Sequence, residues 1–178
     1  MLPDYCIPTQ TWMRELESDG YRVVDVPTPL RQDKMYEGHR DNWGIDDILI
    51  CGQDNVGSVE LIEEMKNCEH QFCASPCEIY PASLGRDGMA VNMIDFVEGE
   101  NGIEQKLYDM DYLKTKQFVN GICGGGLSMI KKELQLKMDI VKNPFHHQNS
   151  DYMLSKLARP NLPQGFHLHG LHEHMKKF

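Results

Sequence analysis

The sequence has no apolar run near the roughly 18 residues that a membrane-spanning helix needs. Its first residues, MLPDYCIPTQTW, lack the basic and then apolar order of a secretory signal peptide. Positive charge is also scarce, because 18 Lys and Arg stand against 27 Asp and Glu, which gives a net charge of −9. Such a chain repels the backbone of a nucleic acid overall. We therefore expect a cytoplasmic protein with no transmembrane segment and no nucleic-acid partner.

Internal repeats, low-complexity segments and linkers rich in Gly, Ser or Pro are absent as well, so nothing divides the chain into domains. The 178 residues, 40% hydrophobic and 25% charged, have the composition of an ordinary globular domain. Six irregularly spaced cysteines without an export signal favour reduced thiols over a disulfide framework. We expect a single domain over residues 1–178.

Short apolar runs alternate with helix signals along the first part of the chain. Strands are predicted at residues 4–9 (DYCIPT), 21–27 (YRVVDVP) and 47–51 (DILIC). One helix is predicted to end at Gly20, and a second to start at the cap residue Ser58. The second helix should bury Leu61, Ile62 and Met65. Strands separated by helices favour an α/β fold with a mainly parallel sheet, in which ligands bind beyond the carboxyl ends of the strands.

Polar residues stand at the end of each predicted strand. Thr9 ends the first strand, Asp25 lies near the end of the second, and Asp54 follows the third within DDILICGQDN. Taken one by one, such residues are most often helix caps or turn formers. Thr9 or Thr11, for example, is a suitable cap for the first helix.

Taken together, these segments resemble the nucleotide-sugar half of a GT-A fold glycosyltransferase. They come in the same order: IPT, a strand ending in Asp, a loop with HRDNWG, and an apolar strand that runs into ICGQD. The resemblance implies a Rossmann-like α/β domain with a mainly parallel central sheet flanked by helices. It also implies an enzyme that transfers a sugar from a nucleotide-diphosphate donor, such as a UDP- or GDP-sugar, to a hydroxyl acceptor such as a glycan.

The same resemblance implies a metal site after the third strand. In that family an acidic D-x-D motif holds Mn²⁺ or Mg²⁺ against the diphosphate, whose negative charge the cation neutralises. Here Gln53 and Asp54 fill the last two positions of the motif, and Gly52 takes the place of the first acid. A histidine near the C-terminus is a further ligand in many members, so His172 and His174 are candidates. A solvated His-rich tail is the alternative interpretation.

The resemblance also assigns roles to residues outside this motif. Thr9 and Asp25 are expected near the nucleotide, together with Arg40 and Asn42 from the loop before the third strand. Arginine is a good partner for a diphosphate, although an exposed arginine is most often solvated.

The candidate catalytic base is Asp151, in the first turn of a helix predicted between Ser150 and Pro160. In inverting members of the family, an acid at a comparable position takes the proton from the acceptor hydroxyl. The helix dipole also favours a carboxylate at this place, and that needs no catalytic role.

Two alternatives remain. The stretch CEHQFCASPC offers Cys68, His70, Cys73 and Cys77 as a zinc module with mixed ligands, but it lacks a CxxC pair, and a strand predicted there would bury Cys77. Alternatively, the chain is a GT-A domain without turnover that binds nucleotides or serves as an interaction scaffold. The single carboxylate of the motif would agree with that hypothesis.

Overall fold

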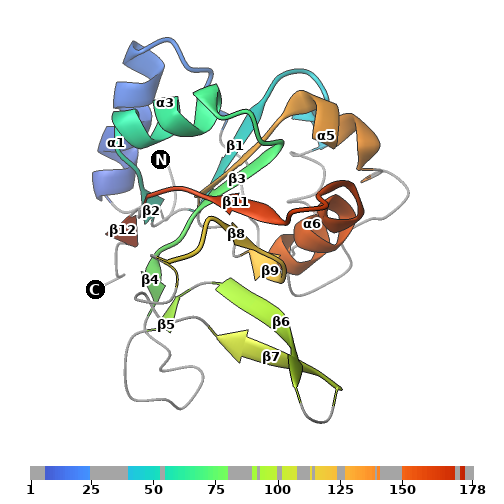
Figure 1. The fold of residues 1–178 in the computed structure, drawn as a ribbon. Coiled ribbons are helices and arrows are strands. Elements are labelled where there is room, and N and C mark those ends of the chain that lie inside the picture. The colour runs from blue at the N-terminus through green and yellow to red at the C-terminus, as the bar shows by residue number, and fades with distance from the viewer. Residues whose placement is uncertain are drawn as a thin grey trace.

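The structure is a computed structural model of the chain. It describes residues 7–24, 40–52, 55–79, 90–91, 93–99, 102–107, 113, 115–123, 127–138, 140, 150–170 and 173–174. Within these ranges, helices lie on both faces of a five-stranded sheet, and a long hairpin extends away from it (Figure 1). The α/β class is therefore confirmed. None of the helices in the described ranges is long and apolar enough to cross a membrane.

The elements follow one another in a mixed order. The helices are α1 (Ile7–Ser18), α3 (Val59–Asn67), α5 (Lys132–Lys137) and α6 (Ser150–Ala158), with a 3-10 turn at Arg159–Asn161. The strands of the main sheet are β1 (Ile48–Cys51), β3 (Phe72–Ser75), β8 (Phe118–Val119), β10 (Leu127–Ile130) and β11 (Phe166–Leu168). The remaining strands are β2 (Asn55–Val56), β4 (Glu78–Ile79), β5 (Ala90–Val91), β6 (Met93–Gly99), β7 (Gly102–Leu107), β9 (Ile122–Cys123) and β12 (Glu173–His174).

The main sheet corrects the expectation of mainly parallel strands. Its order is β1-β10-β3-β11-β8, and only β3 and β11 pair in parallel. Strands β1 and β3 do run in the same direction, because both are antiparallel to β10. Helix α3 between them provides the crossover that such a connection needs. The common direction of β1 and β3 agrees with a strand–helix–strand unit, but the antiparallel strand that lies between them was not predicted.

The N-terminal strand predictions are also corrected. Ile7 begins helix α1, so the last residues of the first predicted strand are helical. Pro8 suits a first helical turn, where its missing N–H costs nothing. Residues 21–24 have no regular structure, and 25–27 lie outside the described residues. The packing of Thr9, Trp12 and Leu16 on one buried helix face outweighs the strand-like composition of the segment.

The strand predicted at residues 47–51 and the helix predicted after Ser58 are both confirmed. Strand β1 lies within the predicted third strand, and α3 begins after Ser58 as predicted. The Ser58 hydroxyl accepts a hydrogen bond from the N–H of Leu61 at 3.1 Å, as an N-cap residue should. The helix buries the three predicted side chains, Leu61, Ile62 and Met65.

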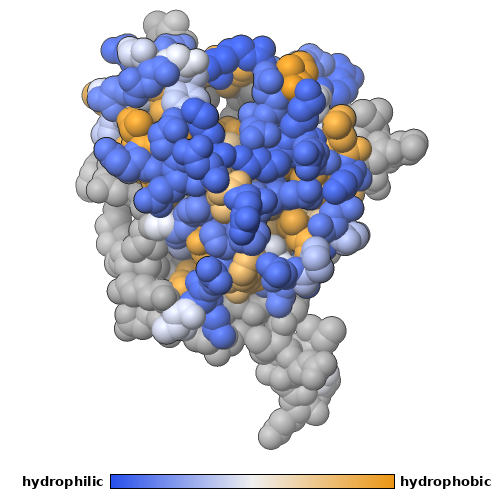
Figure 2. All heavy atoms as spheres, turned by 45° about the horizontal axis from the view of Figure 1, so that its top comes forward, coloured by the Kyte–Doolittle hydropathy of each residue, from blue (hydrophilic) through white to orange (hydrophobic). Residues whose placement is uncertain are grey.

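Apolar side chains form one core cluster on each face of the sheet. Along β3, Phe72 and Ala74 face the cluster under α5 and α6, whereas Cys73 faces the cluster under α1 and α3. The second cluster contains Trp12, Leu16, Leu61, Ile62, Met65, Cys73, Leu127 and Met129. Figure 2 shows that the outer surface at the top of Figure 1 is mainly hydrophilic, with apolar side chains only scattered over it. The helices there bury one apolar stripe and expose a polar one.

Strands β6 and β7 form the hairpin that extends from the lower part of the molecule (Figure 1). Strand β9 pairs with β6 on its other side, which gives a separate three-stranded sheet in the order β7-β6-β9. The hairpin turn contains Gly102, whose φ of 112° is in the region that favours glycine.

Candidate functional site

Asn55 lies at the position where the sequence predicts a nucleotide and metal site. It begins β2, and its N–H donates to the carbonyl of Gly52 at 3.2 Å, which closes the turn after β1. The hydroxyl of Thr9 in α1 donates to the carbonyl of Asn55 at 3.2 Å, and both side chains are buried. Thr9 therefore does not end a strand. It holds this turn from the neighbouring helix.

The C-terminal tail reaches the same turn. Strand β12 pairs with β2 in antiparallel register, with His174 opposite Asn55 and Glu173 opposite Val56. The structure thus brings the backbones of Thr9, Asn55 and His174 together. The other residues predicted at this place are the nucleotide contacts Asp25 and Gln53 and the metal ligands Asp54 and His172, and they lie outside the described residues.

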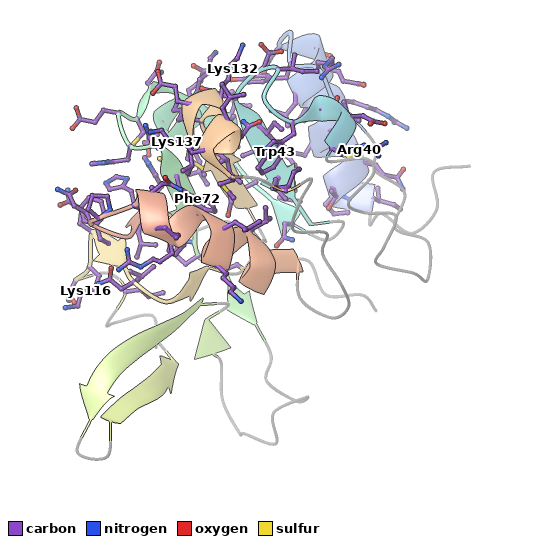
Figure 3. All side chains as sticks on the ribbon, turned by 90° about the vertical axis from the view of Figure 1, so that its right-hand side faces the viewer. Arg40, Trp43, Phe72, Lys116, Lys132 and Lys137 are labelled. Atoms are coloured by element: carbon purple, nitrogen blue, oxygen red, sulfur yellow. The ribbon has the colours of Figure 1, made fainter. Side chains whose placement is uncertain are left out.

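Arg40 and Asn42 lie toward the opposite end of β1. The exposed Arg40 side chain forms an ion pair with Asp41 at 3.2 Å, and Asn42 accepts a hydrogen bond from Arg22 at 2.8 Å. Trp43 precedes β1 in the chain, and its Nε1–H donates to the carbonyl of Gln135 in α5 at 2.8 Å. Figure 3 shows Trp43 beside α5, with Arg40 farther out. These contacts hold the segment at the start of β1, whereas Asn55 follows its end.

Asp151 is the second residue of helix α6, which agrees with the helix predicted from the sequence. The helix packs against β9, and Leu154 and Ala158 contribute to the core cluster on that face. The side chain of Asp151 lies outside what the structure describes. Its role as a base stays a prediction.

A second group of reactive side chains lies on the face of the sheet that α1 and α3 cover. It consists of Cys68, Cys73, His167 and His169, whose candidate ligand atoms all lie within 4.8 Å of one another. Cys68 is the C-cap residue of α3, with its backbone N–H bonded to the carbonyl of Met65. The other three belong to β3 and β11 or follow β11 directly.

Strand geometry explains why these residues meet. His167 pairs with Cys73 across the parallel ladder of β11 and β3, so the two side chains point to the same face. His169 is two residues farther along, and its N–H donates to the carbonyl of Ala74 at 2.9 Å, which continues the ladder. Its side chain is therefore on the same face as His167.

The distances within the group are short. His167 Nδ1 lies 3.2 Å from His169 Nε2 and 3.5 Å from Cys68 Sγ. On its other side, His169 Nδ1 lies 4.0 Å from a carboxylate oxygen of Glu64 in α3. The ring of His70 packs on the ring of His167, with 4.3 Å between centroids.

Burial sets the protonation of this group. It lowers the pKa of His167 to about 4, with help from the neighbouring His70 and His169, and it lowers the pKa of His169 as well. Both imidazoles are therefore neutral at pH 7, which leaves a ring nitrogen lone pair for a metal. Burial raises the pKa of the Cys73 thiol, so a metal would have to displace its proton.

The group only partly matches the zinc module predicted from CEHQFCASPC. Cys68 and Cys73 belong to it, but Cys77 is buried elsewhere, and His70 stacks on a candidate ligand. The two histidines of the group come from the C-terminal segment FHLHGLHEH, whose His172 and His174 are the ones predicted at the other site. Their spacing in FHLH was the available signal, because residues two apart in a strand share a face.

Comparison of the chain with protein-family models, with curated proteins and with solved structures finds no match. The function proposed next therefore depends on the residues and their geometry.

Proposed function

We propose that this chain is a glycosyltransferase that moves a sugar from a nucleotide-diphosphate donor to a hydroxyl acceptor, with the diphosphate bound beyond the end of β1. The main support is the pairing of β12 with β2, which sets His174 opposite Asn55. Opposed Cα atoms in an antiparallel ladder are only about 4.5 to 5.5 Å apart. The tail histidine therefore lies beside the residue that follows Asp54.

The donor set proposed for this turn would suit a hard divalent cation. Asp54 supplies a carboxylate, and His172 or His174 supplies an imidazole, which manganese accepts. Mn²⁺ or Mg²⁺ held there would neutralise the charge of the departing diphosphate. The buried bond from Thr9 to the Asn55 carbonyl supports this arrangement, since it fixes the turn that carries the acid.

The remaining roles are those that the family resemblance implies. Asp25 and Gln53 are the proposed nucleotide contacts, and Asp151 is the proposed base for the acceptor hydroxyl. Thr9 is a positioning residue, because its hydroxyl donates a hydrogen bond to the backbone carbonyl of Asn55. Arg40 and Asn42 are left out of the proposed site, since their neighbours hold them toward the other end of β1.

The test is the thermal stability of the full chain with UDP- and GDP-sugars, each with and without manganese. One donor should raise the melting temperature only when the metal is present, because a ligand at a hundred times its Kd adds about 2.7 kcal/mol. Asp54→Asn should lose this shift. Asp46→Asn makes the same chemical change at an exposed residue just before β1, and it should keep the shift.

Two outcomes would contradict the proposal in different ways. If no donor stabilises the wild type with or without manganese, the chain has no site for these nucleotide sugars. If a donor binds but no nucleotide diphosphate is released in the presence of hydroxyl acceptors, the chain is a nucleotide-binding scaffold instead of an enzyme.

A further inference from the structure

The side chains of Cys68, Cys73, His167 and His169 offer two sulfurs and two imidazole nitrogens at one point. This combination is typical of structural zinc sites. We propose that these four residues bind one zinc ion, which fastens β11 and the end of α3 to β3. The ligands lie on the main sheet and α3, so the site is distinct from the one proposed at β2 and β12.

The distances within the group suit a tetrahedral ion. With Zn–N bonds of about 2.0–2.1 Å and Zn–S bonds of about 2.3 Å, two nitrogens of a tetrahedron are about 3.3 Å apart, and a nitrogen and a sulfur about 3.6 Å. The His167–His169 nitrogens are 3.2 Å apart, and the His167 nitrogen is 3.5 Å from Cys68 Sγ. Both values fit one central ion, and the other ligand pairs, which all lie within 4.8 Å, would close toward similar distances around it.

The surroundings of His169 support the same assignment. Its Nε2 faces His167 and is therefore the ligand atom, which leaves Nδ1 toward Glu64 at 4.0 Å. A histidine that binds a metal usually directs its second ring nitrogen to a carboxylate or carbonyl, which fixes the ring and raises its basicity. Glu64 on α3 is in the position to do this.

The backbone holds the ligands in place before any metal binds. Cys68 ends a helix, Cys73 and His167 are partners in a ladder, and the His169 N–H is bonded to Ala74. Four protein ligands leave no open coordination position, as in structural zinc sites and unlike catalytic ones. The ion would therefore stabilise the fold and would not activate a water or a substrate.

The charge of the ligand set agrees with this assignment. Two thiolates balance the charge of Zn²⁺, and the two histidines add none. The site thus becomes neutral when loaded, which suits its position at the margin of the core cluster under α3.

The first test measures metal content and geometry in the full chain after removal of any affinity tag. We expect one zinc per chain, and after exchange with Co²⁺ an absorption spectrum with tetrahedral bands and a thiolate charge-transfer band. His167→Gln and Cys68→Ser should lose the metal. The matched controls His70→Gln and Cys51→Ser should keep it, because neither residue is in the ligand set. A folded wild type that takes up no zinc, or full zinc content in both ligand variants, would overturn the proposal.

A second test avoids the risk that ligand variants fail to fold. In the wild type, zinc should protect Cys68 from alkylation and a chelator should expose it, whereas the similarly half-buried Cys51 should react equally in both states. Equal reactivity of Cys68 with and without zinc would also overturn the proposal. Glu64→Gln leaves all four ligands in place and should weaken zinc binding about tenfold. Glu63→Gln, at a carboxylate that bonds Tyr21 and Lys66 instead, should bind zinc like the wild type.

Discussion

At the scale of the residue, Gly165 sets the approach of β11 to its neighbour. Its φ of 98° lies in the left-handed region, and a Cβ added there would come within 2.3 Å of the carbonyl oxygen of Val119. The strand that follows carries His167, one of the proposed zinc ligands. Any change at Gly165 would therefore move the strand on which the zinc site depends.

We expect Gly165→Ala to destabilise the protein more than Gly20→Ala. Gly20 also has a positive φ, 89°, but an added Cβ would meet nothing within 4 Å. The conformational cost, about 1–2 kcal/mol, is common to both. The clash with a backbone carbonyl should add roughly 1–3 kcal/mol at Gly165 alone. Urea unfolding of the two variants measures the difference, and equal losses would contradict the close approach of β8.

Single residues also show where sequence reasoning succeeds and where it stops. The alternation in FHLH is enough to place His167 and His169 on one face. Their partners Cys68 and Cys73 are not predictable in this way, because the register between β11 and β3 depends on pairing between distant parts of the chain. The zinc module predicted from CEHQFCASPC therefore shares Cys68 and Cys73 with the group in the structure but lacks His167 and His169.

At the scale of the element, local determinants decide what was predictable. Helix α3 was predicted correctly because its cap and its apolar stripe lie within one short segment. The start of α1 was not, since the composition before Thr9 favours a strand and only burial against the sheet favours the helix. The position of β10 between β1 and β3 follows from no local signal, because that strand comes from a much later part of the chain.

Gln135 joins α5 to the segment that leads into β1. Its side chain is buried, and its amide nitrogen donates to the carbonyls of Asp46 at 2.9 Å and Ile130 at 2.7 Å. Its amide oxygen accepts from the N–H of Gly44 at 2.8 Å. One side chain thus pairs three backbone groups that would otherwise have to find other partners.

We expect Gln135→Leu to lower the free energy of unfolding by about 2–5 kcal/mol. Each buried backbone group left without a partner costs about 1–3 kcal/mol, and water should reach some of the three. Gln117→Leu is the control, since the Gln117 side chain is exposed and its loss should change stability by less than about 0.5 kcal/mol. Chemical denaturation of both variants gives the comparison. Similar losses in both would mean that Gln135 does not hold this junction.

At the scale of the whole molecule, the negative net charge gives the cation proposed beyond the end of β1 a further role. A chain with a net charge of −9 repels a nucleotide diphosphate on average. Donor binding at the proposed site would therefore need a local positive charge, which a divalent cation would provide. The proposed zinc site does not need a second ion to offset the net charge, because all of its ligands are side chains of the chain itself.

The zinc site should stabilise one part of the molecule more than another. Its ligands connect α3, β3 and β11, whereas the β6–β7 hairpin belongs to a separate three-stranded sheet. Two backbone bonds lie at the end of β11: the N–H of Leu168 donates to the carbonyl of Gln117, and the N–H of His169 donates to the carbonyl of Ala74, both at 2.9 Å. These amides should depend on the metal more than the amides of the hairpin do.

Hydrogen exchange of the full chain, with zinc and after chelation, measures this difference. We expect the amides of Leu168 and His169 to exchange about a hundredfold faster without zinc, since a ligand at a hundred times its Kd stabilises by about 2.7 kcal/mol. The amides that pair β6 with β7 should change far less, because that hairpin opens without breaking the zinc ligands. Equal acceleration in both regions would show that the ion supports the whole fold instead of fastening β11. No acceleration at β11 would contradict a zinc site on this strand.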